Sequence, residues 1–256
     1  MASHIRHLLP LTGLLTVAAA PSTPAVAQQA VLELDHAYLV VPAGAAAAIQ
    51  ALRQAGIHID TETVRHDGEG TTSIAAFFEN AYLELLWVDS SVTVDSAHQR
   101  DLTDFRRAAS WRETGASPFG IGLHFQAGSL ADLGIPFRLD TIPDTQPPAA
   151  YVLLRQPAES LAPDVFIMPD DRAVTTWLDR FRRREPEQFA HPAGFHRMTR
   201  VIVHTALGQY PASARLDLRR VRFADSPTAF LEVEFDDGVR GQIWDLRPRL
   251  PLILSH

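Results

Sequence analysis

The sequence predicts an α+β protein that begins with a strand, one helix and three further strands, and three observations support this. Apolar, β-branched and aromatic residues gather in short runs typical of strands. An Ala-rich amphipathic segment after the first run, ended by Gly56, is typical of a helix. A Glu-Asn pair between the last two runs fits a tight hairpin turn. The predicted strands are 31–41, 57–65, 72–79 and 81–88, and the predicted helix is 43–55.

Residues 31–88 are therefore expected to form one four-stranded mixed sheet, with the helix packed on it through Ile49 and Leu52. A polar connecting helix is expected next, followed by a second, diverged module with a short crossover and a Pro-rich loop. The expected segments are a helix at 90–113, a strand at 117–126, a crossover at 127–137, a loop at 141–148, strands at 150–155 and 164–168, a helix at 175–184, and strands at 215–221, 230–235 and 242–246.

The N-terminal residues have the three parts of a secretory signal peptide. Arg6 gives a basic start, residues 8–20 are apolar, and Ala25-Val26-Ala27 fits the small-residue cleavage site. Pro10 interrupts the apolar run, which is also short for a membrane anchor. We expect a signal peptide at 1–27, a first module with its connecting helix at 28–114, a diverged second module with C-terminal strands at 115–256, and a periplasmic or secreted protein.

Composition excludes several kinds of chemistry. The chain has no cysteine, and all 23 of its basic residues are arginine, so disulfides, thiolate nucleophiles and catalytic lysines are absent. The formal net charge of −7 disfavours nucleic acid and anionic lipid as partners. We expect a small-molecule ligand and no membrane association after signal cleavage; a homodimer is left open.

Polar residues interrupt two of the apolar strands. Glu84 lies in the run YLELLWV and shares a strand face with Tyr82 and Leu86, while His36 lies in the run LELDHAYLVV. A buried carboxylate needs a partner, a proton, a cation or a wet cleft, because its desolvation is costly. These side chains therefore predict a functional cleft. A hydrogen-bonded core histidine is the alternative interpretation of His36.

The strand order and motifs resemble the vicinal oxygen chelate superfamily, which includes glyoxalase I, extradiol dioxygenases and bleomycin-resistance proteins. LDH in the first strand resembles the opening of the family's module. His66, Gly68 and Gly70-Thr71, followed by YLELLWVD, resemble the pattern of its glyoxalase-like branch, and HPAG at 191–194 resembles a late HPNGA motif with Ala193 in place of Asn. The resemblance implies paired βαβββ modules whose sheets form a cleft.

The resemblance also implies a metal site, because each module of the metal-bearing members supplies two ligands. By position, His36 and Glu84 match the ligands of the first module, and the metal implied is Zn, Ni, Mn or Fe. The second module departs from the pattern: Gly120 is followed by Ile121 instead of His, and the strand DVFIMP lacks a glutamate in register. His124 is on the strand, but three residues later and on the face opposite Ile121. The missing ligands are sought among His191, His196, His204 and Glu232.

Two functions remain open from the sequence. The first is metal-assisted lyase, isomerase or dioxygenase-type chemistry on a small oxygen-bearing molecule, with Glu84 and His66 moving protons. The alternative is a metal-free protein that sequesters a small molecule, as bleomycin-resistance proteins do. The alternative interpretation of the loop at His66 is structural: its glycines only allow the positive φ angles that the turn requires. His58 and His98 are expected at the surface. The expected substrate-binding residues are His66, Gly70, Thr71, Tyr82 and His191.

Overall fold

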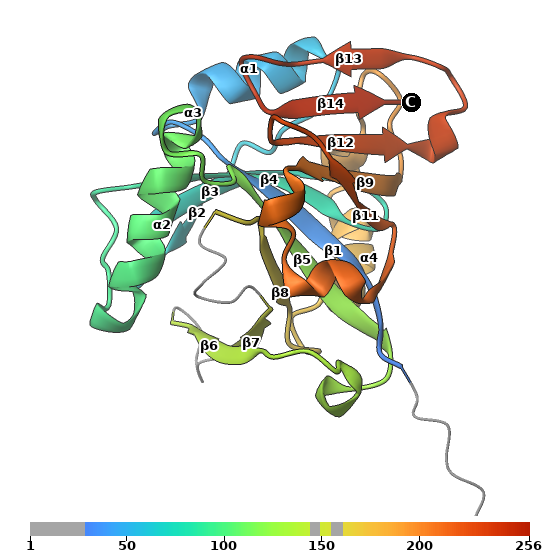
Figure 1. Cartoon of the computed structure of the whole chain (residues 1–256). Helices are drawn as coiled ribbons and strands as arrows, with labels where there is room; N and C mark the ends of the chain where they lie inside the picture. The colour runs from blue at the N-terminus through green and yellow to red at the C-terminus, as the bar shows by residue number, and fades with distance from the viewer. Residues whose placement is uncertain (1–28, 144–148, 155–160) are drawn as a thin grey trace, which may run out of the picture.

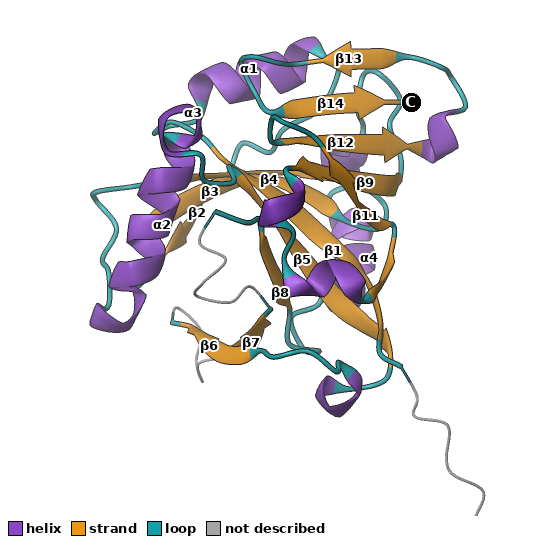
Figure 2. Ribbon diagram, viewed as in Figure 1, coloured by secondary structure: helices purple, strands orange, loops and turns teal. Residues whose placement is uncertain are grey.

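The computed structural model describes residues 29–143, 149–154 and 161–256, and it has a mixed α+β fold with two sheets and few helices (Figure 1, Figure 2). The predicted signal peptide lies outside the described residues. Among the helices described, none has the length and apolar character needed to span a membrane.

The first four strands form the predicted mixed sheet. β1 (Val31–Val40) pairs in parallel with β4 (Tyr82–Val88), and the sheet continues through antiparallel β3 (Thr71–Phe77) and β2 (Val64–His66). Helix α1 (Ala46–Gln54) follows β1 and buries Leu52, with Ile49 partly buried against the same core. The prediction for residues 31–88 is confirmed, and His36 and Glu84 lie on neighbouring strands.

The strand expected at 57–65 is mostly irregular. Only its last two residues belong to β2, because the Asp60 carboxylate accepts hydrogen bonds from the backbone N–H groups of Thr61 and Glu62 and turns the chain there. Ile57 and Ile59 are nevertheless buried, so the apolar pattern of this segment reports burial and not strand pairing.

The next four strands continue the same sheet in the order β5-β8-β7-β6. β5 (Phe119–Ala127) pairs antiparallel with β1, and β8 (Asp164–Ile167) pairs in parallel with β5. β7 (Ala149–Leu153) and β6 (Arg138–Ile142) follow antiparallel. The crossover after β5 contains one 3-10 turn, η2 (Leu130–Asp132). β6 begins directly after the expected crossover and ends in the first two residues of the expected Pro-rich loop. Part of that loop lies outside the described residues.

Three helical segments connect the halves of this sheet: η1 (Ser96–His98), α2 (Gln99–Ala109) and α3 (Trp111–Thr114). After β8 come α4 (Val174–Arg184) and η4 (Pro186–Phe189). The predicted connecting helix is thus shorter than expected, and the predicted helix 175–184 is confirmed. In Figure 1, α2 lies at the left-hand side of the molecule, and it contacts β4 and β1.

The C-terminal strands form a separate five-stranded sheet instead of joining the second module. Its order is β11-β9-β12-β14-β13. The short β10 (Asp217–Arg219) instead pairs with the start of β1, so the predicted strand 215–221 is divided between two sheets. The five strands are β9 (Met198–Thr205), β11 (Val221–Asp225), β12 (Phe230–Phe235), β13 (Ile243–Asp245) and β14 (Leu252–Ser255), and the 3-10 segments η5 (Leu207–Gln209), η6 (Ala212–Arg215) and η7 (Asp236–Gly238) connect them.

The main hydrophobic core lies on one face of the nine-stranded sheet. Leu39 of β1 and Leu83 and Leu85 of β4 pack there with α1 and with Val201 and Leu254 of the second sheet. Alternation along the strands turns the intervening side chains to the opposite face. That opposite face carries the polar residues of β1 and β4, so the fold places them away from the main core.

Candidate functional site

A cleft lies on the face of the nine-stranded sheet opposite the main core. One hollow of about 200 Å³ joins both halves of the sheet. A second hollow of about 370 Å³ lies beside it, and His66, Tyr82 and Glu84 line both. His36 lines the first hollow. Four side chains singled out from the sequence therefore meet in one cleft.

A buried carboxylate orients His36. Nδ1 of His36 lies 2.8 Å from Oδ1 of Asp35, and Oδ2 of Asp35 accepts a 2.6 Å hydrogen bond from the backbone N–H of Val174, the first residue of α4. Nδ1 of His124 lies 3.6 Å from Oδ2 of Asp35. With Nδ1–H donating to Asp35, Nε2 of His36 becomes the acceptor nitrogen. Asp35 thus fixes the histidine that lines the cleft.

Asp35 retains its charge despite burial. Burial raises the pKa of the Asp35 carboxyl, but the proximity of His124 and His36 and the hydrogen bond from the Val174 N–H outweigh this effect, so its pKa lies below the ordinary value. The N-terminus of α4 also favours an anion. The carboxylate therefore remains able to accept the proton of His36 Nδ1.

Glu84 is balanced by two histidines. Burial disfavours its charge, but His66, His36 and the Ser73 hydroxyl more than compensate and lower the pKa of Glu84 to about 2. Nε2 of His66 lies 3.7 Å from Oε1 of Glu84 and 3.0 Å from Oγ of Ser73. Glu84 is therefore an ionised carboxylate at neutral pH, suited to accept hydrogen bonds but a weak base.

Tyr82 is the aromatic part of the same cluster. Its ring stacks on the His36 imidazole, with ring centroids 4.4 Å apart and an interplanar angle of 12°. Burial, and then the charges of Glu84 and Asp35, raise the pKa of Tyr82 well above its usual value. The phenol therefore remains protonated and can act as a donor, not as a base.

The second half of the sheet contributes different residues at the matching positions. By strand order and register, His36 and Tyr38 match Gly120 and Gly122 of β5, while Tyr82 and Glu84 match Asp164 and Phe166 of β8. The two glycines leave room for the rings of His36 and Tyr38. A Cβ added at Gly122 would lie 2.5 Å from the His36 ring, and one at Gly120 would lie 2.4 Å from the Tyr38 ring.

Side chains from the second half of the sheet and from α4 complete the walls of the cleft. The Tyr38 hydroxyl donates a 2.7 Å hydrogen bond to Asp164, and Phe166 packs edge-on to the His36 ring at 5.3 Å. On the side of the larger hollow, Phe77 packs against Phe181 of α4 with ring centroids 4.8 Å apart. The polar centre of the cleft therefore has aromatic walls on two sides.

Other residues predicted to bind a substrate lie elsewhere. Gly70 has φ of 73° and packs against Val94, and Thr71 is fully buried. His191 is buried against the ring of Phe78; its Nδ1 accepts a 3.0 Å hydrogen bond from the His58 N–H, and its Nε2 donates a 2.9 Å hydrogen bond to the Phe77 carbonyl. None of the three lines the cleft, so we reassign them to the loop and the core.

The remaining candidates for the second module's ligands are also outside the cleft. His204 pairs with Glu232 at 3.2 Å on the five-stranded sheet, and His196 is exposed. His124 shares the cleft-side face of β5 with the glycines, opposite the core residue Ile121, and its place is beside Asp35. His204 and Glu232 are thus on the other sheet, His196 is exposed outside the strands, and His124 lies beside Asp35, so none of them lines the cleft with His36 and Glu84.

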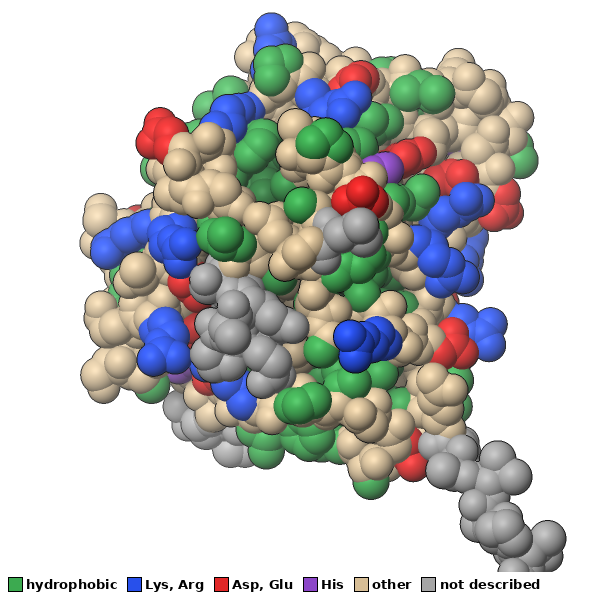
Figure 3. Space-filling view, viewed as in Figure 1, with side chains coloured by type: hydrophobic (Ala, Val, Ile, Leu, Met, Phe, Trp, Pro, Cys, Tyr) green, Lys and Arg blue, Asp and Glu red, His purple; other side chains and the backbone are tan. Residues whose placement is uncertain are grey.

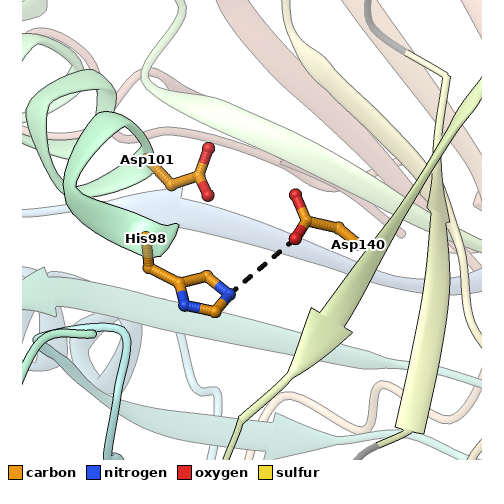
Figure 4. A group of neighbouring side chains, drawn as sticks. All are labelled: His98, Asp101 and Asp140. Carbon is orange, nitrogen blue, oxygen red and sulfur yellow. Dashed lines mark ion pairs between the residues drawn. The ribbon is translucent and has the colours of Figure 1, made fainter. Parts of the chain in front are cut away.

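One group in the described part of the chain has the arrangement needed to hold a metal ion: His98, Asp101 and Asp140 (Figure 4). His98 is buried, contrary to the surface position we expected, and its Nε2 lies 3.8 Å from Asp140 Oδ1. Arg138 already bridges the two carboxylates, at 3.3 Å from Asp101 and 3.0 Å from Asp140. A cation here would compete with the Arg138 guanidinium.

Sequence reasoning did not assign Asp35, Tyr38, Ser73, Asp164 or this acidic group to the site. Asp35 and Tyr38 flank His36, and their polarity within an apolar strand was a usable signal. The pairing of Tyr38 with Asp164 joins residues 126 positions apart, and no local pattern predicts such a contact.

Comparisons with known proteins leave the family open. No family model matches the chain, and no curated protein is similar to it in sequence. A solved structure described as a hypothetical protein from Staphylococcus aureus is similar over 88% of this chain and 98% of that chain, with 13% identity and a TM-score of 0.47. At this level the similarity carries no conclusion about function.

Proposed function

We propose that the cleft binds a small oxygen-bearing organic molecule, as in the glyoxalase-like proteins that this chain resembles. The observation that carries this proposal is the convergence of His36, His66, Tyr82 and Glu84 on one hollow with aromatic walls. A few polar groups within an otherwise apolar pocket are the common composition of small-molecule sites. Hydroxyl or carbonyl oxygens of a ligand would meet both donors and acceptors there.

The strand order supports a more specific fold assignment, to paired βαβββ modules. β5-β8-β7-β6 repeats the order β1-β4-β3-β2, and each half has one parallel pair, at the end where it meets the other half. We assign the two halves to paired βαβββ modules, the second having lost its helix. The 3-10 turn η2 occupies the place of that helix.

The residues do not fit the four-ligand metal set of the superfamily. The positions that match His36 and Glu84 hold Gly120 and Phe166, which have no ligating side-chain atom. The Glu84 carboxylate already has the ring of His66 3.7 Å away, and His66, His36 and Ser73 together lower its pKa. We therefore propose that the ligand is bound by the protein groups alone, as in the sequestering alternative.

A binding screen tests this proposal directly. The purified protein is presented with diols, hydroxy acids and α-carbonyl compounds, and binding is measured by calorimetry. The expected result is saturable binding of at least one class, weakened tenfold or more in Glu84→Gln and unchanged in the control Glu187→Gln, whose side chain is exposed. Binding that is equal in both variants would place the ligand elsewhere.

Proton transfer is a second candidate function, favoured by the Asp35–His36 pair. Nε2 of His36 can take a proton from a carbon or oxygen acid held against it, while the ionised Glu84, whose low pKa makes it a weak base, can orient that acid by accepting a hydrogen bond. Incubation of each bound compound with the protein, followed by NMR in D₂O, would reveal exchange or isomerisation. An unchanged spectrum for every bound compound would leave sequestration as the function.

We also propose that the protein is exported, from the tripartite pattern of residues 1–27. Intact-mass measurement of the protein from its own cells should give a chain that begins at Gln28. A mature chain that retains Met1 to Ala27 would contradict this.

A further inference from the structure

A second hollow, remote from the cleft, has the character of an anion site. Its volume is about 580 Å³, and it lies where the start of β1 and β10 meet β9 and β11. Four arginines and a single acid are among the residues that line it. The lining residues are Glu33, Gln126, Thr199, Arg200, Arg219, Arg220 and Arg222.

Two of the four arginines are already paired. Nε of Arg220 lies 2.7 Å from Oε1 of Glu33, and Nη2 of Arg200 lies 3.0 Å from Oε1 of Glu234. Arg220 has φ of 67° and is the one residue between β10 of the nine-stranded sheet and β11 of the other. Its ion pair therefore stabilises the chain where it passes from one sheet to the other, and the neighbouring arginines lie on this stabilised segment.

The charges of the other two arginines are not balanced by a carboxylate of the described residues. Nη1 of Arg222 donates to the carbonyls of Leu218 and Val221 at 2.8 and 2.9 Å, which positions its guanidinium without neutralising it. Arg219 is exposed and forms no ion pair within the described chain. Two positive charges thus face one hollow in a protein whose formal net charge is −7. Figure 3 shows basic side chains gathered, beside acidic ones, at the right-hand edge of the molecule.

We propose that this hollow binds the phosphate group of a small organic phosphate monoester, a function separate from that of the cleft. Guanidinium groups bind phosphate oxygens through paired, charge-assisted hydrogen bonds. A phosphate monoester carries close to two negative charges at neutral pH and so matches the two uncompensated arginines better than a monocarboxylate does. The volume leaves room for the organic part of the ester beside the polar Gln126 and Thr199.

The test measures binding of inorganic phosphate and of glycerol phosphate by calorimetry, at constant ionic strength set with chloride. Both should bind, glycerol phosphate at least as tightly, and affinity should fall as salt rises. The double variant Arg219→Gln/Arg222→Gln should weaken binding by about tenfold or more, as expected for loss of charge-assisted contacts. The control Arg53→Gln/Arg183→Gln makes the same change of charge at exposed helix positions and should bind as wild type does.

Arg219→Gln alone guards against misfolding, because the exposed side chain of Arg219 makes no hydrogen bond among the described residues. This variant should bind several-fold more weakly with an unchanged melting temperature. Glu84→Gln should bind phosphate normally, which separates this site from the cleft. No binding above the chloride background, or equal losses in the control, would overturn the proposal. Glycerol phosphate binding tenfold more weakly than inorganic phosphate would overturn the assignment to an ester.

Discussion

The two halves of the nine-stranded sheet have the same strand order but different cleft-facing residues. The half from β1 to β4 contributes His36, Tyr82 and Glu84, whereas the matching positions of the other half hold Gly120, Asp164 and Phe166. The first half therefore supplies most of the ionisable side chains of the cleft, and the second supplies space, the ring of Phe166 and the carboxylate that accepts the Tyr38 hydrogen bond. A repeated topology thus need not carry a repeated site.

The largest effect is expected from the buried carboxylate that supports the polar half. Asp35→Ala removes the partner of His36 and of the Val174 N–H, which leaves buried groups unpaired. The free energy of unfolding should fall by about 3–5 kcal/mol, the usual loss when one member of a buried pair is removed. Urea denaturation measures it, with the exposed Asp67→Ala as control. A loss no larger than that of the control would show that the network is not structural.

The second prediction concerns His191, a histidine of the core that lies outside the cleft. Burial lowers the pKa of His191 to about 4, so the folded state holds it neutral while the unfolded state takes up a proton below pH 6.5. Its contribution to stability is complete above pH 6.5 and is lost as the pH falls towards 4, by about 2 kcal/mol at pH 5. His191→Gln should lose this part of the pH dependence, and the exposed His196→Gln should keep it. Identical pH profiles for wild type and His191→Gln would contradict the assignment.

The third prediction concerns the space that Gly122 leaves for the His36 ring. Gly122→Ala places a methyl group against the His36 ring and should cost about 1–3 kcal/mol, as overpacking does. Gly208→Ala, where a Cβ would meet nothing within 4 Å, is the matched control. Thermal denaturation of both variants compares them. If Gly122→Ala is as stable as the control, His36 does not occupy the position described.

Local patterns predicted the first half well because its strands and helix are consecutive and strongly periodic. Alternation placed Tyr82 and Glu84 on one face of their strand, whereas the joint placement of His36 and Glu84 came from the resemblance. Alternation also grouped His36 with Leu34, which lies in the core instead because the register shifts between them. The five-stranded sheet could not be predicted in this way, since β9, β12 and β14 pair across long loops. The same limit applies to His191, whose HPAG motif resembles a functional one, while its actual partners, Phe77 and His58, are more than a hundred residues away.

The state of Glu84 also differs from the sequence-based expectation. The desolvation cost of a partly buried carboxylate predicts that, without a metal, Glu84→Gln is neutral or slightly stabilising. Because His66 and His36 lower the pKa of Glu84 to about 2, its ionised form stabilises the folded state instead. That stability is complete above the ordinary carboxyl pKa of 4.5 and is lost as the pH falls towards 2.

The central claim is that neighbouring protein groups, and not a metal ion, stabilise the charge of Glu84 in the cleft. The stability of Glu84→Gln tests it most directly. The free energy of unfolding of wild type and variant is measured from pH 2 to 7 in chelator, and again with Zn, Ni, Mn or Fe(II). We predict that the variant is less stable at pH 7 by up to about 3 kcal/mol, that the difference closes below pH 4.5, and that metals change neither value. Equal stabilities in chelator, with a difference that arises only when metal is added, would contradict the account and restore His36 and Glu84 as metal ligands.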